Sequence, residues 1–332
     1  MSEVLLELKD FSVQYVVGKE VVHAVNGINL VVNRGESVGL VGETGAGKTT
    51  TALSILRLLP RYTGKIPKGD IIIDGKSVLG FNNAQLRMLR GGTVSMIFQD
   101  PMTSLNPLMP VGKQIAEVIQ MHEPKLDDKE VSSRVDEMLN MVGIPAQRGN
   151  EYPHQFSGGM KQRVMIAIAI ACNPELLIAD EPTTALDVTI QAQVLNMIRN
   201  LKKKFNSAMI LITHDMGVVA SICDKVAIVY AGEIVEFGNL RDVFDMSRDH
   251  HPYTLGLFQS IPLFNERTRR LKPIEGLMPD PTNLPKGCKF HTRCPEVLDV
   301  CSIQNPNVIE ERGHKVKCVL FNETERRIVE DN

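Results

Sequence analysis

The most specific pattern in this chain is Gly42-Glu43-Thr44-Gly45-Ala46-Gly47-Lys48-Thr49, which fits GxxxxGK[ST]. It follows an apolar run at 37–41 and precedes a helical pattern at 49–59. Glycines at a strand-to-helix turn let successive backbone N–H groups converge on phosphate oxygens. Lys48 can then reach the β- and γ-phosphates of a nucleotide, and the Thr49 hydroxyl can bind Mg²⁺. The sequence therefore predicts an α/β fold of the P-loop NTPase class.

Working outward, short β-rich runs alternate with helical patterns, as in an α/β domain with a largely parallel sheet. Several runs lack polar alternation, which is typical of strands buried on both faces. The predicted strands are 4–8, 37–41, 70–73, 94–98, 176–180, 209–213 and 226–230. The predicted helices are 49–59, 131–142 and 190–205, the last two with apolar residues spaced by three and four.

The domain organisation follows from where this alternation stops. A mainly helical pattern with prolines at its start predicts an inserted helical subdomain at about 100–155. Past about Gly238 the alternation fades, and prolines punctuate an irregular stretch. We therefore predict a nucleotide-binding domain at 1–240 and an appended extension at 241–332.

Composition excludes several classes of protein. The 332 residues are 43% hydrophobic and 23% charged, as in soluble globular proteins. The net charge of -2 lacks the basic surplus of a nucleic-acid-binding protein. No signal peptide is recognisable, and the longest strongly apolar run, 164–172, is half of the roughly 18 to 20 residues that span a bilayer. These features predict a cytoplasmic chain.

Two adjacent carboxylates, Asp180 and Glu181, end the apolar strand predicted at 176–180. Because strand residues alternate faces, the two acids can take different roles. We expect Asp180 to hold Mg²⁺ through water and Glu181 to act as general base on the attacking water.

A second anion-binding pattern, Ser157-Gly158-Gly159, opens an apolar helix 23 residues before Asp180. Here the chain resembles the ATP-binding cassette (ABC) ATPases, whose signature LSGGQ reads Phe156-Ser157-Gly158-Gly159-Met160, with Phe for Leu and Met for Gln. The resemblance implies an ABC ATPase core with an antiparallel β subdomain. It also implies head-to-tail pairing, in which each ATP lies between the phosphate loop of one domain and Ser157 to Gly159 of the other.

The resemblance extends to further motifs in the family's order. Gln99 matches the Q-loop glutamine, Ala185-Leu186-Asp187 the D-loop and His214 the switch histidine, while Tyr15 lies where the family stacks an aromatic ring on adenine. The implied catalytic residues are Lys48, Gln99, Glu181 and His214. The implied Mg²⁺ site is Thr49, Gln99 and Asp180. The implied nucleotide contacts are Tyr15, Gly42, Thr44, Gly45, Ala46, Gly47, Lys48, Thr49, Thr50, Gln99, Ser157, Gly158, Gly159, Asp187 and His214.

The C-terminal part resembles the extension of oligopeptide and dipeptide importer ATPases. The similarity lies in His251-Pro252-Tyr253-Thr254, the proline-rich stretch, and the segment 287–295 around Cys288 and Cys294. It implies peptide import, with nickel import as an alternative. The implied partners are a second ABC ATPase, related or identical, two transmembrane permease subunits and, indirectly, an extracytoplasmic peptide-binding protein, with no nucleic acid. The implied location is peripheral, on the cytoplasmic face of the cell membrane.

The competing hypothesis is that the chain belongs to a different class with such cassettes, the DNA-repair and chromosome ATPases. Those proteins usually insert long heptad arms or zinc modules, whereas the insertion here is compact. If the chain is a transporter ATPase, the permease should dock around 100–120 through Leu105, Leu108, Met109 and Ile115.

Four of the six cysteines, Cys288, Cys294, Cys301 and Cys318, lie within 31 residues with the spacing C-x5-C-x6-C-x16-C. Structural zinc sites favour CxxC pairs, which are missing here, whereas wide and uneven spacing suits a larger cluster. We predict a [4Fe–4S] cluster held by these four thiolates, with Zn²⁺ or four unligated thiols as alternatives. Cys172 and Cys223 lie in apolar runs and are predicted to be core residues.

Overall fold

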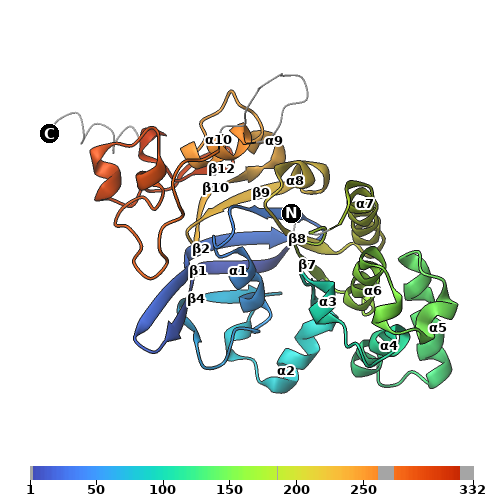
Figure 1. Cartoon of the computed structure of the whole chain (residues 1–332). Helices are drawn as coiled ribbons and strands as arrows, with labels where there is room; N and C mark the ends of the chain where they lie inside the picture. Colours follow the sequence, from blue (N-terminus) through green and yellow to red (C-terminus); the bar gives the residue numbers. More distant parts are fainter. Residues whose placement is uncertain (1–2, 185, 261–272, 322–332) are drawn as a thin grey trace.

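The structure is a computed structural model that describes residues 3–184, 186–260 and 273–321 (Figure 1). The elements are β1 (Val4–Val17), β2 (Glu20–Asn33), β3 (Ser37–Val41), α1 (Lys48–Ile55), β4 (Gly64–Ile73), β5 (Lys76–Ser77), α2 (Asn83–Met88), β6 (Val94–Ile97), α3 (Pro101–Ser104), α4 (Val111–His122), α5 (Asp128–Met141), α6 (Gly158–Ile170), β7 (Leu176–Asp180), α7 (Val188–Phe205), β8 (Ala208–Thr213), α8 (Met216–Ile222), β9 (Lys225–Tyr230), β10 (Glu233–Asn239), α9 (Leu240–Val243), α10 (Pro252–Gln259), β11 (Ile309–Glu311) and β12 (His314–Val316).

The larger sheet has the strand order β11-β12-β10-β9-β3-β8-β7-β6, and its strands from β9 to β6 are parallel. Every residue of β3, β7 and β8 is buried, which explains their unbroken apolar sequences. Parallel pairing puts the carboxyl ends of β3, β8, β7 and β6 at one edge. The loops that follow these four strands therefore meet there.

The smaller sheet is antiparallel, with the order β2-β1-β4-β5, so the expected antiparallel subdomain is confirmed. The first strand is longer than the predicted 4–8, and β2 was missing from the prediction. Asn26-Gly27 lies in the middle of β2, where it interrupts the alternation and imitates a turn, and Gly27 has a φ of 72°. Pairing along β1, with register shifts, keeps the strand continuous through this point. Conversely, the helix predicted at 49–59 ends early because Arg57 adopts a left-handed conformation, with a φ of 54°.

The helices α3, α4 and α5 lie between β6 and α6 in the chain and pack against α6. Asp127 starts α5 with a capping box that Glu130 completes. Two predicted docking residues are placed differently from the expectation: Leu105 is 3% exposed and Ile115 is fully buried, because both face the core of this subdomain. Leu108 is 87% exposed, and Met102, which the sequence did not single out, is 62% exposed.

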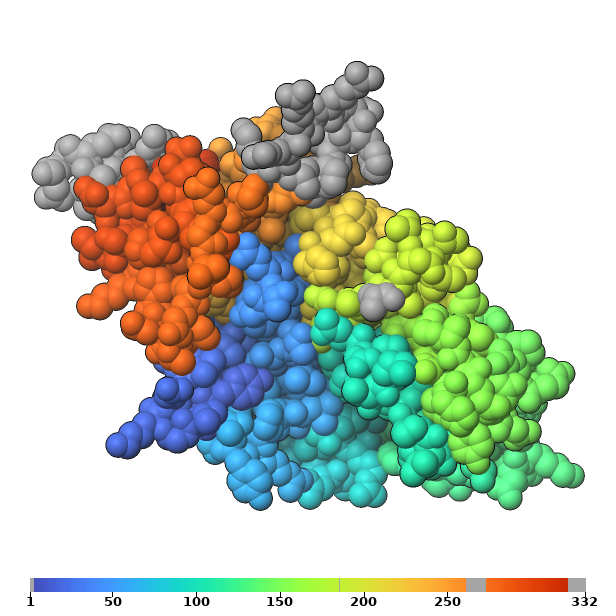
Figure 2. Space-filling model, viewed as in Figure 1, coloured from blue at the N-terminus to red at the C-terminus, as the bar shows by residue number. Residues whose placement is uncertain are grey.

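The C-terminal segment, which is the extension predicted at 241–332, adds two strands to the larger sheet. The strand β12 pairs antiparallel with β10 and β11 with β12, and Lys317 forms an ion pair of 2.6 Å with Glu233 of β10. Apart from α9 and α10, the remaining described residues of this segment form loops and short 3₁₀ turns, and these surround the four cysteines. Figure 2 shows it in orange and red at the opposite end of the core from the green helical subdomain. None of the described helices has the length and apolar character of a membrane-spanning segment.

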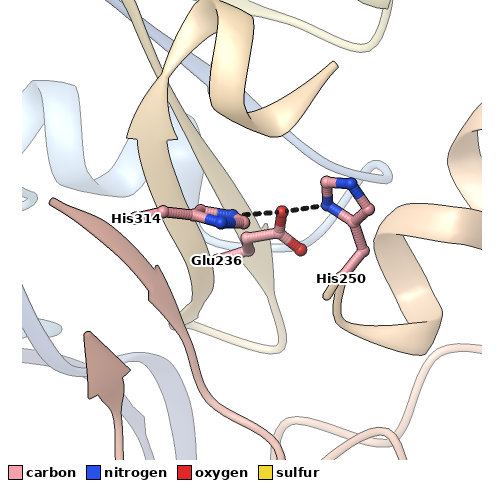
Figure 3. A group of neighbouring side chains, drawn as sticks. All are labelled: Glu236, His250 and His314. Carbon is pink, nitrogen blue, oxygen red and sulfur yellow. Dashed lines mark hydrogen bonds and ion pairs between the residues drawn. The ribbon is translucent and has the colours of Figure 1, made fainter. Parts of the chain in front are cut away.

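A buried ionic network joins this segment to the core at Glu236 of β10, whose side chain is fully buried (Figure 3). Its Oε1 lies 2.7 Å from Nδ1 of His250 and 2.9 Å from Nε2 of His314, and its Oε2 accepts the N–H of His251 at 2.8 Å. His250 Nε2 also lies 2.9 Å from the carbonyl oxygen of Asp245. Both ring nitrogens of His250 thus face acceptors, so the ring carries both protons and pairs with a carboxylate.

The protonation of this network follows from burial and hydrogen bonding. Burial would raise the pKa of Glu236, but the two histidines outweigh it and lower the pKa to about 2. The same carboxylate raises the pKa of His250 despite burial. Burial lowers the pKa of His251 to about 4, and its Nδ1 accepts the N–H of Tyr253 at the start of α10. His251 is therefore a neutral cap inside the protein.

Because the folded state keeps His251 neutral while the unfolded chain protonates it below about pH 6.5, acid favours unfolding here. We expect the titration of His251 to lower the free energy of unfolding by on the order of 2 kcal/mol when the pH falls from 7.5 to 5. In His251→Asn, an asparagine can cap α10 without titrating, so the pH profile should be flatter by that amount. Denaturant titrations of both proteins measure it, and parallel profiles would contradict this assignment.

Candidate functional site

A pocket of about 400 Å³ lies at the edge where the four parallel strands end. Its floor is the glycine-rich loop and the start of α1, and Gln99, Glu181 and His214 arrive from the ends of β6, β7 and β8. The predicted residues on its wall are Tyr15, Thr44, Gly45, Gly47, Lys48, Thr49, Thr50, Gln99, Glu181 and His214. One pocket therefore gathers ten of the residues that the sequence singled out.

Close contacts with neighbouring backbone require glycine at two places in the loop between β3 and α1. A Cβ on Gly42 would lie 2.1 Å from the carbonyl oxygen of Val229, and one on Gly47, whose φ is 96°, would lie 2.3 Å from that of Ala24. Gly42 and Ala46 are buried beneath the loop and do not line the pocket. These two small residues allow the loop to pack closely against the neighbouring backbone.

Lys48 is the buried cation of the pocket, with 6% exposure. Its Nζ donates hydrogen bonds to the carbonyl oxygens of Gly42 at 2.7 Å and Glu43 at 2.9 Å. Burial lowers the pKa of Lys48, and the carboxylates of Glu181, Asp180 and Glu43 act against this shift. The ammonium group thus lies inside the loop, held by carbonyl groups, where an anion would give it a stronger partner.

Asp180 fits a divalent cation. It is 2% exposed, and its Oδ1 is buried with no hydrogen-bond partner among the described residues. Burial raises the pKa of Asp180, and the adjacent Thr49 side chain partly offsets the rise. A carboxylate oxygen and a hydroxyl beside a phosphate-binding loop are the donors that Mg²⁺ prefers. Bound Mg²⁺ would satisfy the unpartnered oxygen and stabilise the ionised form.

Glu181 is the centre of a polar cluster. Gln99 Nε2 and Thr184 Oγ1 donate to its Oε2 at 3.0 and 2.8 Å, and His214 Nδ1 lies 3.3 Å from its Oε1. Burial would raise the pKa of Glu181, but the hydrogen bonds from Thr184 and His214 lower it overall. Its backbone is left-handed, with a φ of 43°, a conformation that is strained for glutamate. An ionised carboxylate is thus held in the wall of the pocket.

The far side of the pocket is formed by the small sheet. The Tyr15 hydroxyl donates to Thr50 Oγ1 at 3.3 Å, and Val22 and Ala24 of β2 lie beside it. Pro281 of the C-terminal segment also lines the pocket, and its carbonyl oxygen accepts the N–H of His23. The sequence did not single out Val22, Ala24 or Pro281, because only pairing between distant strands and loops brings them here.

Four predicted nucleotide contacts lie away from this pocket. Ser157 and Gly158 are exposed at the start of α6, where Ser157 Oγ accepts the N–H of Met160. Gly159 follows them, and Asp187 caps α7 by accepting the N–H of Ile190 at 2.9 Å. Ala185 lies outside the described residues. Within one copy of the chain, these four residues do not complete the pocket; their predicted contact requires a second cassette.

The four C-terminal cysteines lie near one another. Burial raises the pKa of Cys294 to about 11 and that of Cys318 to about 12, and the neighbouring thiols add to both shifts. The N–H of Cys288 donates to the carbonyl oxygen of Cys301. Among the described residues, no three of these sulfurs lie within 4.8 Å of one another. Cys223 is buried in the core, as predicted, and Cys172 is half-buried.

The chain matches two family models, "ABC transporter" over residues 25–184 and "Oligopeptide/dipeptide transporter, C-terminal region" over residues 235–301. The oligopeptide transport ATP-binding protein AppD of Bacillus subtilis is 47% identical over 322 residues, covering 96% of this chain and 97% of its own. The dipeptide transport ATP-binding protein DppD of Bacillus subtilis is 44% identical, over 96% and 97% of the two chains. OppD of Salmonella typhimurium, an oligopeptide transport ATP-binding protein, is 46% identical over 92% and 90%.

Solved structures agree with this relationship. The dimeric ATP-binding cassette MJ0796, in a post-hydrolysis state bound to ADP and phosphate, aligns with a TM-score of 0.65 and 27% identity. The alignment covers 71% of this chain and 99% of that cassette. The phosphate loop, the carboxylates at the end of β7 and the near full-length identity lead to one conclusion: the chain belongs to the ATP-binding cassette transporter ATPases, in the family of oligopeptide and dipeptide transport ATP-binding proteins.

Proposed function

We propose that this protein is the ATP-hydrolysing subunit of a peptide importer. The observation that carries the proposal is one pocket in which a phosphate-binding loop faces an ionised glutamate. The same chain carries the C-terminal segment that matches peptide transporters. We further propose the division into a nucleotide-binding domain at 1–240 and an extension at 241–332. The charge balance of -2 speaks against the DNA-repair alternative, and nickel import is the alternative within the family.

Each side chain in the pocket has a role that its position supports. The amides of residues 44–49 and Lys48 would bind the phosphates, and Tyr15 would stack on adenine. Asp180, Thr49 and Gln99 would hold Mg²⁺, which neutralises phosphate charge. Glu181 would take a proton from the attacking water, with Gln99 and His214 orienting the carboxylate.

A second cassette would complete the site. The exposed start of α6 offers the Ser157 hydroxyl and the amides of Gly158 and Gly159, a helix N-terminus that favours an anion. Asp187 lies exposed at the start of α7. We propose that a related or identical ATPase pairs head to tail with this chain, so that the γ-phosphate of each ATP meets the partner's α6.

Permease subunits would dock on the helical subdomain from the cytoplasmic face of the membrane, while a peptide-binding protein would deliver the peptide on the other side. Leu108 and Met102 are the exposed apolar side chains on this subdomain near Gln99 in sequence, so a contact here could reach the cluster around Glu181. This surface replaces Leu105 and Ile115, which are buried.

We propose that Cys288, Cys294, Cys301 and Cys318 hold a [4Fe–4S] cluster. A tetrahedral zinc site with Zn–S bonds of about 2.3 Å needs sulfurs about 3.8 Å apart. The wider spread of the four thiols favours a larger cluster with its iron atoms at separate corners. The protein side of the site is built from 3₁₀ turns and loops, which such a cluster would crosslink.

Two substitutions separate chemistry from coupling in the transporter reconstituted with its permease subunits. Glu181→Gln should keep ATP binding and lower ATP turnover at least 10²-fold, since it removes the general base. Leu108→Glu should keep the basal ATPase activity of the isolated subunit and lose peptide uptake. Radiolabelled peptide uptake and phosphate release measure both. Normal turnover in Glu181→Gln would refute the base, and stimulation by DNA instead of peptide would refute the importer.

The four-cysteine site is tested by purifying the chain without oxygen. The [4Fe–4S] cluster should give a brown protein with absorbance at about 400 nm and four irons per chain. Cys301→Ser should lose this absorbance, whereas the control Cys172→Ser should keep it. A colourless protein with one zinc per chain would establish the zinc alternative, and a protein with neither metal would leave four unligated thiols.

A further inference from the structure

Glu43, the second residue of the phosphate-binding loop, is held at three points. Its peptide N–H donates to the Tyr253 hydroxyl at 2.9 Å, and its carbonyl oxygen accepts from Lys48 Nζ at 2.9 Å. Its carboxylate forms a bidentate pair with Arg293, with distances of 2.7 and 3.1 Å. Tyr253 and Arg293 both belong to the C-terminal segment, so this segment makes two of the three contacts.

The guanidinium group of Arg293 is held in place by its surroundings. Its side chain is 4% exposed, and it donates to the carbonyl oxygens of Glu275 at 2.9 Å and Ile274 at 3.2 Å. Burial alone would lower its pKa, but the pairing with Glu43 and the contact with Tyr230 raise it. The cation is therefore permanent, and its position is set by the backbone of the C-terminal segment.

Tyr253 is positioned with comparable rigidity. It is fully buried, and its ring packs against Tyr230 at 4.7 Å and Phe290 at 5.4 Å between ring centroids. Its own N–H is bound by His251, whose N–H is in turn bound by the buried Glu236. The ionic network of Figure 3 thus determines where α10 begins, and thereby where the Tyr253 hydroxyl meets the loop.

The charge of Glu43 gives these contacts a functional consequence. Its carboxylate belongs to a loop that must receive a polyphosphate, and its field is felt by Lys48, the cation of that loop. An uncompensated anion at this place would repel the incoming phosphates. Arg293 neutralises it, and because the Arg293 side chain is itself buried, this pairing is screened less than one between two exposed groups. Pro281, on the pocket wall, is a further contact from the same segment.

We propose that the C-terminal extension completes the phosphate-binding loop, with Tyr253 and Arg293 as positioning residues that act through Glu43. Tyr253 fixes the backbone of the loop, and Arg293 cancels the charge of its carboxylate. The proposal rests on the proposed function only in taking ATP as the ligand of the pocket. On this proposal the extension is a part of the nucleotide site.

The test is ATP affinity and steady-state ATPase kinetics of the full chain. Tyr253→Phe removes one hydrogen bond and should raise the KM for ATP about 2- to 10-fold with kcat nearly unchanged. Arg293→Gln leaves Glu43 uncompensated and should weaken ATP binding further. The double variant Glu43→Gln with Arg293→Gln removes both charges and should recover most of the lost affinity. Such recovery would not occur if Arg293 served only to hold the loops at 274–275.

Arg312→Gln is the matched control, because Arg312 also lies in the extension but its side chain is 82% exposed. It should bind ATP like the wild type. Normal affinity in both Tyr253→Phe and Arg293→Gln, or a double variant as weak as Arg293→Gln, would overturn the proposal. Should Arg293→Gln fail to fold, the comparison of Tyr253→Phe with the wild type decides. A wild type that binds no ATP would instead overturn the proposed function.

Discussion

The in-register pairing of four parallel strands is the constraint on which this molecule depends. Leu40 of β3 and Asp180 of β7 both pair with Ile212 of β8, and Ile97 of β6 pairs with Ala179. Since parallel strands end at one edge, the residues that follow them arrive together. Thr44 of the phosphate loop and His214 are 170 positions apart, yet they share one pocket with Gln99 and Glu181.

The second organising feature is a set of two glutamates, Glu236 and Glu43, whose ion pairs connect the C-terminal segment to the core. Glu236 pairs with histidines from two loops, and Glu43 pairs with Arg293. A buried charge without its partner is strongly unfavourable, and one member of each pair is buried, Glu236 in the first and Arg293 in the second. Each pair therefore fixes the relative position of the elements that it joins. Together they make the extension continuous with the sheet on one side and with the phosphate loop on the other.

The accuracy of the sequence predictions depended on the range of the interactions involved. The strands β3 and β7 were predicted at their exact bounds because burial on both faces leaves an unbroken apolar run. The strand β2 was missed because its Asn26-Gly27 pair has the local signature of a turn and only pairing with β1 overrides it. Likewise, Leu105 and Ile115 were predicted to be docking residues, since an apolar residue does not by itself show whether the neighbouring helices cover it.

The sequence by itself determined the class of fold, the phosphate loop and the acidic pair, because these are contiguous motifs whose geometry follows from local backbone chemistry. The tertiary structure alone decided that Pro281 lines the pocket and that Tyr253 and Arg293 reach Glu43. These contacts join residues more than 200 positions apart. Their geometry is set by how β10, β12 and α10 pack, which no local pattern encodes.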